Sequence, residues 1–277
     1  MAKKGDKLSV VLRTIVNAAA VITLTAIAFV ILYILIKGIP HLSLDLFAWE
    51  YNSENVSLLP ALINTVYMAI ISLLVAVPLG IGAAIYLVEY AGKGNKLVEV
   101  VRVTAETLSG IPSIVYGLFG SLFFVKFMEL GMSLVSGALT LSIMILPLIM
   151  RSSEEALLAV PISYREGSFG LGAGKLRTVF KIVLPSAIPG ILSGIILGIG
   201  RIVGESAALI FTAGTVAEVV TSLMDSTRTL AVHMYTISGE GLYINQTYAT
   251  AVVLLVLVIV INTISEMIAK RLGGRNE

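Results

Sequence analysis

Long apolar runs separated by polar segments dominate the pattern of this sequence. Six runs each hold about 20 mostly apolar residues, the length with which an α-helix crosses the hydrocarbon core of a bilayer. The runs are 15–36, 62–88, 108–127, 132–150, 188–211 and 248–268. The pattern therefore predicts an all-α, polytopic membrane protein with six transmembrane helices.

Composition supports a membrane protein and excludes several other classes. Hydrophobic residues make up 57% of the chain and charged residues 13%, whereas about a quarter of the residues in a soluble domain are charged. The formal net charge of +2 is too small to indicate a nucleic-acid partner. The chain has no cysteine, which excludes disulfides and cysteine nucleophiles. We expect no metal site, because His41 and His233 have no partner at ligand spacing.

The lysines and arginines predict which ends of the helices face the cytoplasm, since basic loops favour that side. With the N-terminus inside, Lys37, Lys126 and Arg228 fall outside and Arg201 falls within an apolar run, while the other 15 of the 19 basic residues fall inside. The run 15–36 follows a basic start but is longer than the apolar core of a signal peptide, about 7 to 15 residues. We therefore predict a retained first helix and two cytoplasmic termini.

The stretch FGLGAGKLRT at 169–178 looks at first like a phosphate-binding loop. A P-loop needs G-x-x-x-x-G-K-[ST], and here Phe169 replaces the first glycine and Leu176 the hydroxyl residue. The dinucleotide pattern G-x-G-x-x-G fails at Lys175. The chain is therefore not predicted to hold ATP, and no set of serine, histidine and carboxylate indicates catalysis.

The fifth run carries two charges, Arg201 and Glu205, in the stretch GRIVGES. An arginine at the bilayer centre costs at least about 2.5 to 3.5 kcal/mol, so such residues normally face a bundle interior or a water-filled path. Four residues apart on a helix, the two side chains are expected to pair. Either Arg201 binds an anion such as phosphate with its planar donors, or the pair only fixes the helix register.

The segment 151–187 contains a spaced pattern: E-A-A, three residues, G, nine residues, I-x-L-P. The residues that fill it are Glu166, Gly167, Ser168, Gly172, Ile182, Leu184 and Pro185. On this spacing the segment resembles the coupling loop of ABC importer permeases, with Gly167 and Ser168 in place of the two alanines. The resemblance implies that these residues dock on a cytoplasmic ATPase subunit. The alternative is a solvated basic loop that only follows the charge bias of cytoplasmic segments.

The run GRIVGESAALIFTAG at 200–214 resembles a segment of the PstA permeases, one of the two permease families of the phosphate importer. The stretch SGIPSIVYGLFG at 109–120 agrees with that family. The resemblance implies the MetI-like fold of type I ABC importers, and it places the charged transport positions on Arg151, Arg201 and Glu205. For Arg151, an anchor at the inner end of the fourth helix is the alternative. Two ridges of small residues on the fifth helix predict close packing, one of them against a second permease subunit: Gly190, Gly194 and Gly198, and Gly200, Gly204 and Ala208.

The same resemblance implies a function and a set of partners. The chain would be an inner-membrane permease subunit for inorganic phosphate, paired with a PstC-like permease and served by a PstS-like phosphate-binding protein. ATP and Mg would be used by a PstB-like ATPase dimer. A permease for another oxyanion such as molybdate, the PstC-like partner itself, an ion-driven carrier and a sensory subunit remain alternatives. The predicted parts are a segment 1–14, a first helix 15–36, a permease core 62–268 with the coupling loop 151–187, and a tail 269–277.

Overall fold

The computed structural model describes residues 3–92 and 94–273, and their side chains within 9–92 and 94–268. Within these ranges the chain is helical with no strand, as predicted. Its helices are α1 (Lys3–Gly38), α2 (Leu59–Ile85), α3 (Lys96–Ser109), α4 (Ser113–Gly120), α5 (Leu134–Ala159), α6 (Ile162–Gly170), α7 (Lys175–Thr178), α8 (Leu184–Val203), α9 (Ala207–Thr212), α10 (Leu230–Glu240) and α11 (Ile244–Gly273). Wider π-helical turns extend α2 (Tyr86–Tyr90) and α4 (Ser121–Phe127) and join α7 to α8 (Val179–Val183).

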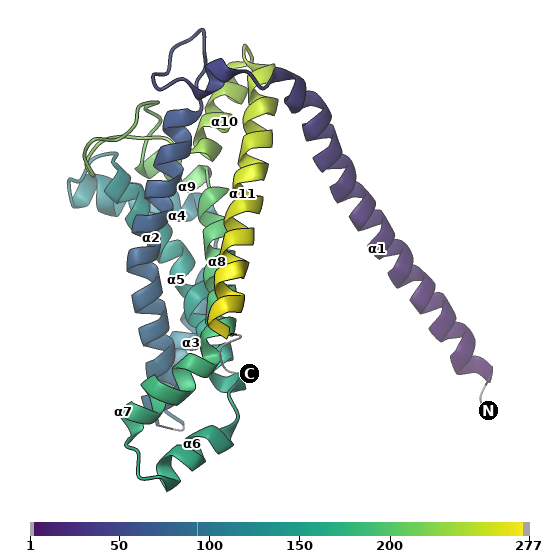
Figure 1. Cartoon of the computed structure of the whole chain (residues 1–277), viewed down its shortest axis with the longest axis vertical. Coiled ribbons are helices and arrows are strands. Elements are labelled where there is room, and N and C mark those ends of the chain that lie inside the picture. The colour runs from purple at the N-terminus through teal and green to yellow at the C-terminus, as the bar shows by residue number, and fades with distance from the viewer. Residues whose placement is uncertain (1–2, 93, 274–277) are drawn as a thin grey trace.

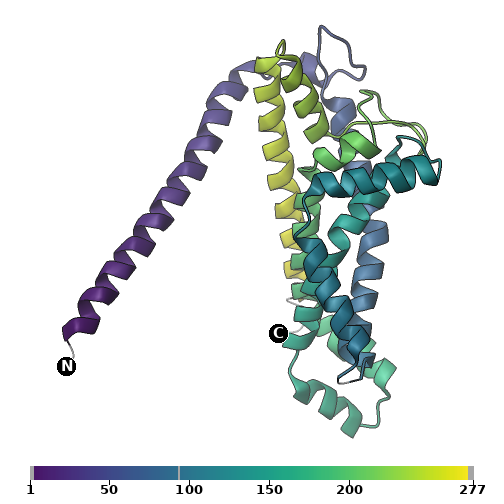
Figure 2. The same cartoon turned by 180° about the vertical axis from the view of Figure 1, so that it is seen from behind.

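Helix α5 lies at the centre of the bundle, packed against α2 and α8 (Figures 1 and 2). Its apolar side chains Leu141, Met144, Ile145 and Ile149 are buried in one cluster with residues of both neighbours. The helices pack closely at small residues, because in lipid helix association depends on van der Waals contact and not on the hydrophobic effect. A Cβ added at Gly80 of α2 would lie 2.9 Å from Ile149.

The first ridge of small residues on α8 is used inside the chain. A Cβ at Gly190 would lie 2.6 Å from Ala156 of α5, and one at Gly194 would overlap the Ser152 hydroxyl. This ridge is therefore covered by α5 and is not free to meet a second subunit. The other ridge is split, because α8 ends before Ala208, whereas a Cβ at Gly200 would meet nothing within 4 Å.

The predicted third helix, 108–127, is not one straight helix. α3 ends at Ser109 and α4 begins at Ser113, and the two axes differ by 104°. Pro112 disfavours a helical conformation in the residue before it, and Gly110 weakens the helix further. Within the described chain, five helices are long and apolar enough to cross a membrane, or six if this bent pair counts as one span.

Two other predicted runs have different ends in the structure. The fourth, 132–150, continues as α5 to Ala159, so that the first residues of the predicted loop 151–187 are helical. The fifth, 188–211, is interrupted after Val203 and resumes as the short helix α9. Both differences change the surroundings of the charged residues described below.

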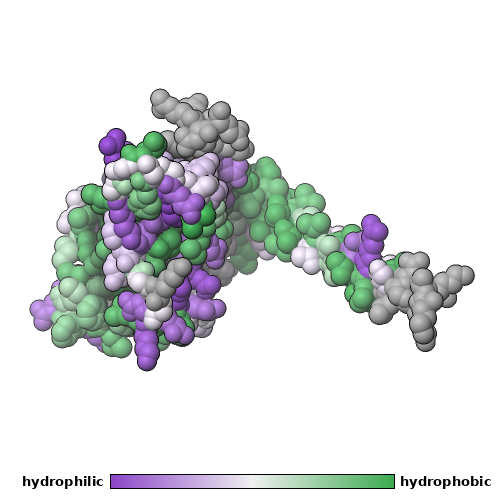
Figure 3. All heavy atoms as spheres, turned by 90° about the horizontal axis from the view of Figure 1, so that it is seen from below, coloured by the Kyte–Doolittle hydropathy of each residue, from purple (hydrophilic) through white to green (hydrophobic). Residues whose placement is uncertain are grey.

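Helix α1 leaves the bundle as a long arm (Figures 1 and 2). Residues 9–30 are exposed throughout, and contact with α11 comes at the end of the helix, where Tyr33 packs edge-on against Tyr248 and Gly38 approaches its carbonyl. The arm is hydrophobic along most of its length in Figure 3. Its N-terminal end and the C-terminal end of α11 lie on the same side of the molecule as α6 and α7.

Candidate functional site

A break in the fifth apolar run separates the two charges predicted there. α8 ends at Val203 and α9 begins at Ala207. Glu205 lies in this break and is 8% exposed, and its Oε1 accepts a hydrogen bond of 3.1 Å from the backbone N–H of Ala208. The Glu205 carboxylate therefore caps α9, where the free N–H groups of the first turn favour a negative charge.

Arg201 lies in the last turn of α8 and is half-buried. The predicted Arg201–Glu205 ion pair is wrong, because the helix ends between the two residues and the geometry of a helical turn is lost. Within the described part of the chain, the Arg201 guanidinium makes no hydrogen bond or ion pair. The phenol of Tyr116 in α4 lies near enough to interact electrostatically with the Arg201 charge. A charged donor without an internal carboxylate thus stands at the helix break.

Arg151 lies within α5 rather than at its inner end, because α5 continues beyond it. Its side chain is 43% exposed, and its Nη1 lies 3.8 Å from Oε1 of Glu106, a contact that contributes little on an exposed surface. Its neighbour Ser152 faces Gly194, about 10 Å along α8 from Arg201 at 1.5 Å per residue. The structure therefore places the two arginines at different depths of the bundle.

The coupling loop folds as two short helices at one end of the bundle, α6 and α7 (Figure 1). Gly172 makes the turn between them with φ of +81°, a backbone conformation that glycine adopts readily. Glu166 and Gly167 are exposed, whereas the buried hydroxyl of Ser168 lies 2.8 Å from that of Thr178 and joins α6 to α7. Serine at this position is therefore used in the fold, which spacing alone did not indicate.

The surface of the loop combines charge with exposed apolar side chains. Leu171 at the turn is 91% exposed, and Leu176 of α7 is 66% exposed. Figure 3 looks onto this end of the molecule, where hydrophilic residues gather. Exposed apolar groups with a polar rim mark interaction sites on proteins.

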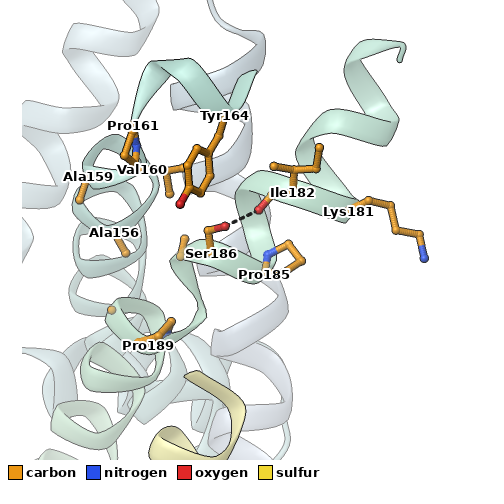
Figure 4. A pocket seen from close by; sticks show the side chains of 12 residues that line it. Ala156, Ala159, Val160, Pro161, Tyr164, Lys181, Ile182, Pro185, Ser186 and Pro189 are labelled. Atoms are coloured by element: carbon orange, nitrogen blue, oxygen red, sulfur yellow. Dashed lines mark hydrogen bonds between the residues drawn. The ribbon is translucent and has the colours of Figure 1, made fainter. Parts of the chain in front are cut away.

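The I-x-L-P part of the pattern lies behind this surface. Ile182 and Pro185 line a cavity of about 530 Å³ between the end of α5, α6 and the start of α8, and Leu184 is half-buried nearby. In Figure 4 the Tyr164 ring hangs from α6 into the cavity, and Lys181 extends away from it. These residues therefore shape the hinge between the loop and α8 rather than its exposed tip.

A second polar cluster lies in the segments at the opposite end of the bundle. Arg228 is 4% exposed, and its Nε and Nη2 have no hydrogen-bond partner in the described chain; nor has either ring nitrogen of the fully buried His233. The Tyr51 ring contacts both side chains. Burial, with a smaller effect of the Arg228 charge, lowers the pKa of His233 to about 3, and burial also lowers the pKa of Arg228. Sequence analysis gave this cluster no role, because its members come from separate segments.

Within residues 3–92 and 94–273, no three histidine, cysteine or acidic side chains lie close enough together to hold a metal ion.

Known proteins share the sequence pattern of most of this chain. Residues 76–275 match the family model described as "Binding-protein-dependent transport system inner membrane component". A "Probable ABC transporter permease protein YqgI" of Bacillus subtilis is 35% identical over 225 residues, covering 76% of each chain. A "Phosphate transport system permease protein PstA" of Pasteurella multocida is 38% identical over 189 residues, covering 68% of this chain and 67% of that one. A "Phosphate transport system permease protein PstA 1" of Mycobacterium tuberculosis is 42% identical over 154 residues, covering 56% and 50%.

Solved structures share the fold at low sequence identity. A chain of the MetNI methionine ABC transporter aligns with a TM-score of 0.61 and 21% identity, covering 77% of this chain and 93% of that one. A chain of a bacterial alginate ABC transporter aligns with a TM-score of 0.71 and 15% identity over 98% of both chains. These likenesses show the fold alone.

Fold and family match together define a multi-pass inner-membrane permease of the ABC importers, with the MetI-like fold. The chain belongs to the family of binding-protein-dependent transport system inner membrane components. Within that family it is a permease of the PstA type.

Proposed function

We propose that this permease moves inorganic phosphate through a path on which Arg201 is a binding residue. The observation that carries the proposal is the half-buried Arg201 guanidinium, which has no carboxylate partner within the described chain and stands at a helix break. A guanidinium presents fixed, always-charged donors that match phosphate oxygens. The names of the PstA relatives support phosphate as the anion.

Glu205 has a supporting part in this proposal. Because its carboxylate is occupied by the backbone of α9, it leaves Arg201 free instead of neutralising it. It also keeps a negative charge near the path, which weakens the hold on a bound anion and favours its release. We propose that Arg151, about 10 Å further along the bundle at 1.5 Å per helical residue, takes over the anion toward the cytoplasmic side.

Transport needs partners, which we infer from the surfaces of the chain. A PstC-like permease would complete the path, with the exposed arm α1 lying against it in the bilayer. A PstB-like ATPase dimer would use ATP and Mg and would bind the exposed face of α6 and α7, including Glu166 and Leu171. A PstS-like binding protein would deliver phosphate to the other end. In this orientation α6, α7 and both ends of the chain lie in the cytoplasm, in agreement with the basic residues there.

Uptake of radiolabelled phosphate into proteoliposomes that contain the assembled importer tests the proposal. We expect ATP-dependent uptake, a loss of at least about tenfold in Arg201→Gln, and partial retention in Arg201→Lys, which keeps the charge without the planar donors. Phosphate uptake by Arg201→Gln equal to the parent would remove Arg201 from the path. Competition by molybdate and sulfate tests the second candidate, a permease for another oxyanion, because strong competition with little phosphate uptake would favour it.

A further inference from the structure

Arg165, which directly precedes Glu166 in α6, ties the coupling loop to the end of α2. Its Nε and Nη2 donate to Oε1 of Glu89 at 3.0 and 2.7 Å. Both side chains are largely buried, 17% and 9% exposed. A bond of this kind, with two donors on one carboxylate oxygen in a dry setting, holds its partners in a defined geometry.

The same guanidinium also holds the end of α5. Nη1 donates to the carbonyl of Val160 and Nη2 to that of Leu157, both at 2.9 Å. All three nitrogens of Arg165 therefore have partners, and these partners lie at the ends of two other elements, α2 and α5. A movement of α6 cannot leave the ends of α2 and α5 in place unless these bonds break.

A second contact attaches the other half of the loop to the same turn of α2. The Lys175 ammonium of α7 lies 5.0 Å from the centre of the Tyr90 ring, within the range of a cation–π contact. The hydroxyls of Ser168 and Thr178 join α6 to α7, and each of these two helices has a contact with the turn Tyr86–Tyr90.

The opposite end of α2 is bonded to the external segment 213–229 and to α10. Asn64 donates to the Glu218 carbonyl at 2.7 Å and accepts from the Val220 N–H at 3.2 Å. The Thr65 hydroxyl accepts from the N–H of Leu230 at 2.8 Å. Helix α2 thus runs as one connected element from the coupling loop to the external segment.

We propose that Arg165 and Glu89 are positioning residues that pass the movement of the ATPase-docked loop to α2, and through α2 to the external segment 213–229. Lys175 and Tyr90 form a second, weaker link on the same path. The inference rests on the proposed docking of an ATPase on α6 and α7, but not on the identity of the transported anion.

The chain offers a matched control at the same end of the bundle. Arg102 of α3 donates from Nε to Oε1 of Glu154 in α5 at 2.7 Å, and this ion pair involves neither α6 nor α7. Glu89→Gln and Arg102→Gln each remove one charge from an ion pair at this end. Only the first interrupts the link between the loop and α2.

The test uses the assembled importer in liposomes and three readouts. ATPase binding is measured by co-purification, coupling by the phosphate moved per ATP hydrolysed, and movement by the distance between spin labels at Ser53→Cys and Met224→Cys, two exposed external positions. Because the chain has no cysteine of its own, the spin labels attach in this subunit only at the two introduced cysteines. The distance is compared with and without vanadate-trapped ATP.

We expect Glu89→Gln to keep the ATPase bound while the phosphate moved per ATP falls at least about tenfold and the ATP-driven change in label distance is lost. Arg102→Gln is expected to stay within about twofold of the parent. Equal losses in both variants, or unchanged coupling in Glu89→Gln, would overturn the proposal. If Glu89→Gln does not fold, Lys175→Ala decides: a loss of about threefold in phosphate moved per ATP supports the link, and an unchanged ratio contradicts it. If the ATPase does not bind the parent, or the label distance changes with ATP while phosphate does not move, the fault lies in the proposed function instead.

Discussion

The guanidinium carbon of Arg228 lies 4.5 Å from the centre of the Tyr51 ring, and this contact joins the connection between α1 and α2 to the segment before α10. The ring also meets His233 edge-on, with 6.0 Å between the ring centres. Both basic side chains are buried, and for the charged Arg228 the aromatic face takes the place of an acidic partner. A cation–π contact away from water is worth about 2 kcal/mol.

Replacing the Tyr51 ring is therefore expected to destabilise the contact between the α1–α2 connection and the segment before α10. Tyr51→Leu should lower the free energy of unfolding by about 2 kcal/mol, because Arg228 loses its aromatic partner while it stays buried. Tyr51→Phe keeps the ring and should stay within about 0.5 kcal/mol of the parent. Thermal unfolding of the detergent-purified chain measures both, and an equal effect of the two variants would contradict the role of the ring.

Acid should destabilise the fold through His233. Its folded pKa of about 3 lies below the unfolded value of 6.5, so the unfolded chain binds the proton more readily. The contribution of neutral His233 is fully present above about pH 6.5 and is lost as the pH falls from there toward about 3, by at most about 1.4 kcal/mol per pH unit.

The matched variant for this prediction is His233→Gln, which does not titrate. We expect the stability of the parent relative to this variant to fall between about pH 6.5 and pH 4, with little change between pH 7 and pH 8. Unfolding temperatures across this range provide the measurement. A difference that is independent of pH would show that His233 is not held neutral by the fold.

Glu205 variants separate the capping role from the charge. Glu205→Gln keeps an oxygen that accepts from the Ala208 N–H, so its free energy of unfolding should stay within about 0.5 kcal/mol of the parent, whereas Glu205→Ala should lose at least about 1 kcal/mol. Phosphate uptake by Glu205→Gln then reports on the charge alone. Equal free energies of unfolding for Glu205→Gln and Glu205→Ala would contradict the capping role of Glu205.

Gly117 of α4 packs so closely against α9 that there is no room for a side chain at this position. A Cβ there would lie 2.8 Å from the Ala208 Cα, which is backbone and cannot turn aside. Gly117→Val should therefore prevent α4 from packing on α9 and reduce the folded yield at least about fivefold, consistent with the cost of overpacking. Gly110→Ala, where the nearest atom is 3.5 Å away, is the matched control and should be tolerated.

Much of the fold followed from the sequence, because apolar runs of bilayer length and a one-sided distribution of basic residues leave little choice of architecture. The breaks did not. Runs 108–127 and 188–211 are apolar over most of their length, and hydropathy does not register that Pro112 or Gly204 interrupts a helix. Arg201 was therefore predicted to pair with Glu205 on one continuous helix. In the structure the Glu205 carboxylate instead accepts a hydrogen bond from the backbone of α9.

Spacing led to the prediction of a coupling loop in the segment that folds as α6 and α7, but it did not predict the contacts that hold this segment in place. Arg165 and Glu89 are 76 residues apart in the chain, and one sequence without an alignment offers no signal that joins them. An indication was present in Glu89 itself, a carboxylate directly after a long apolar run that needs a partner if it is buried. The buried Arg228 and His233 were missed for the same reason, since their shared partner Tyr51 comes from another segment.

The isolated arm α1 bears on how the chain is held in the membrane. Its residues 9–30 are exposed, and its polar side chains Thr14 and Thr23 donate to carbonyls of their own helix. Such a segment needs no other helix to satisfy its polar groups in the bilayer. The arm is therefore suited to cross the membrane as a span of its own, whose stability in lipid does not depend on the assembly of α2 to α11.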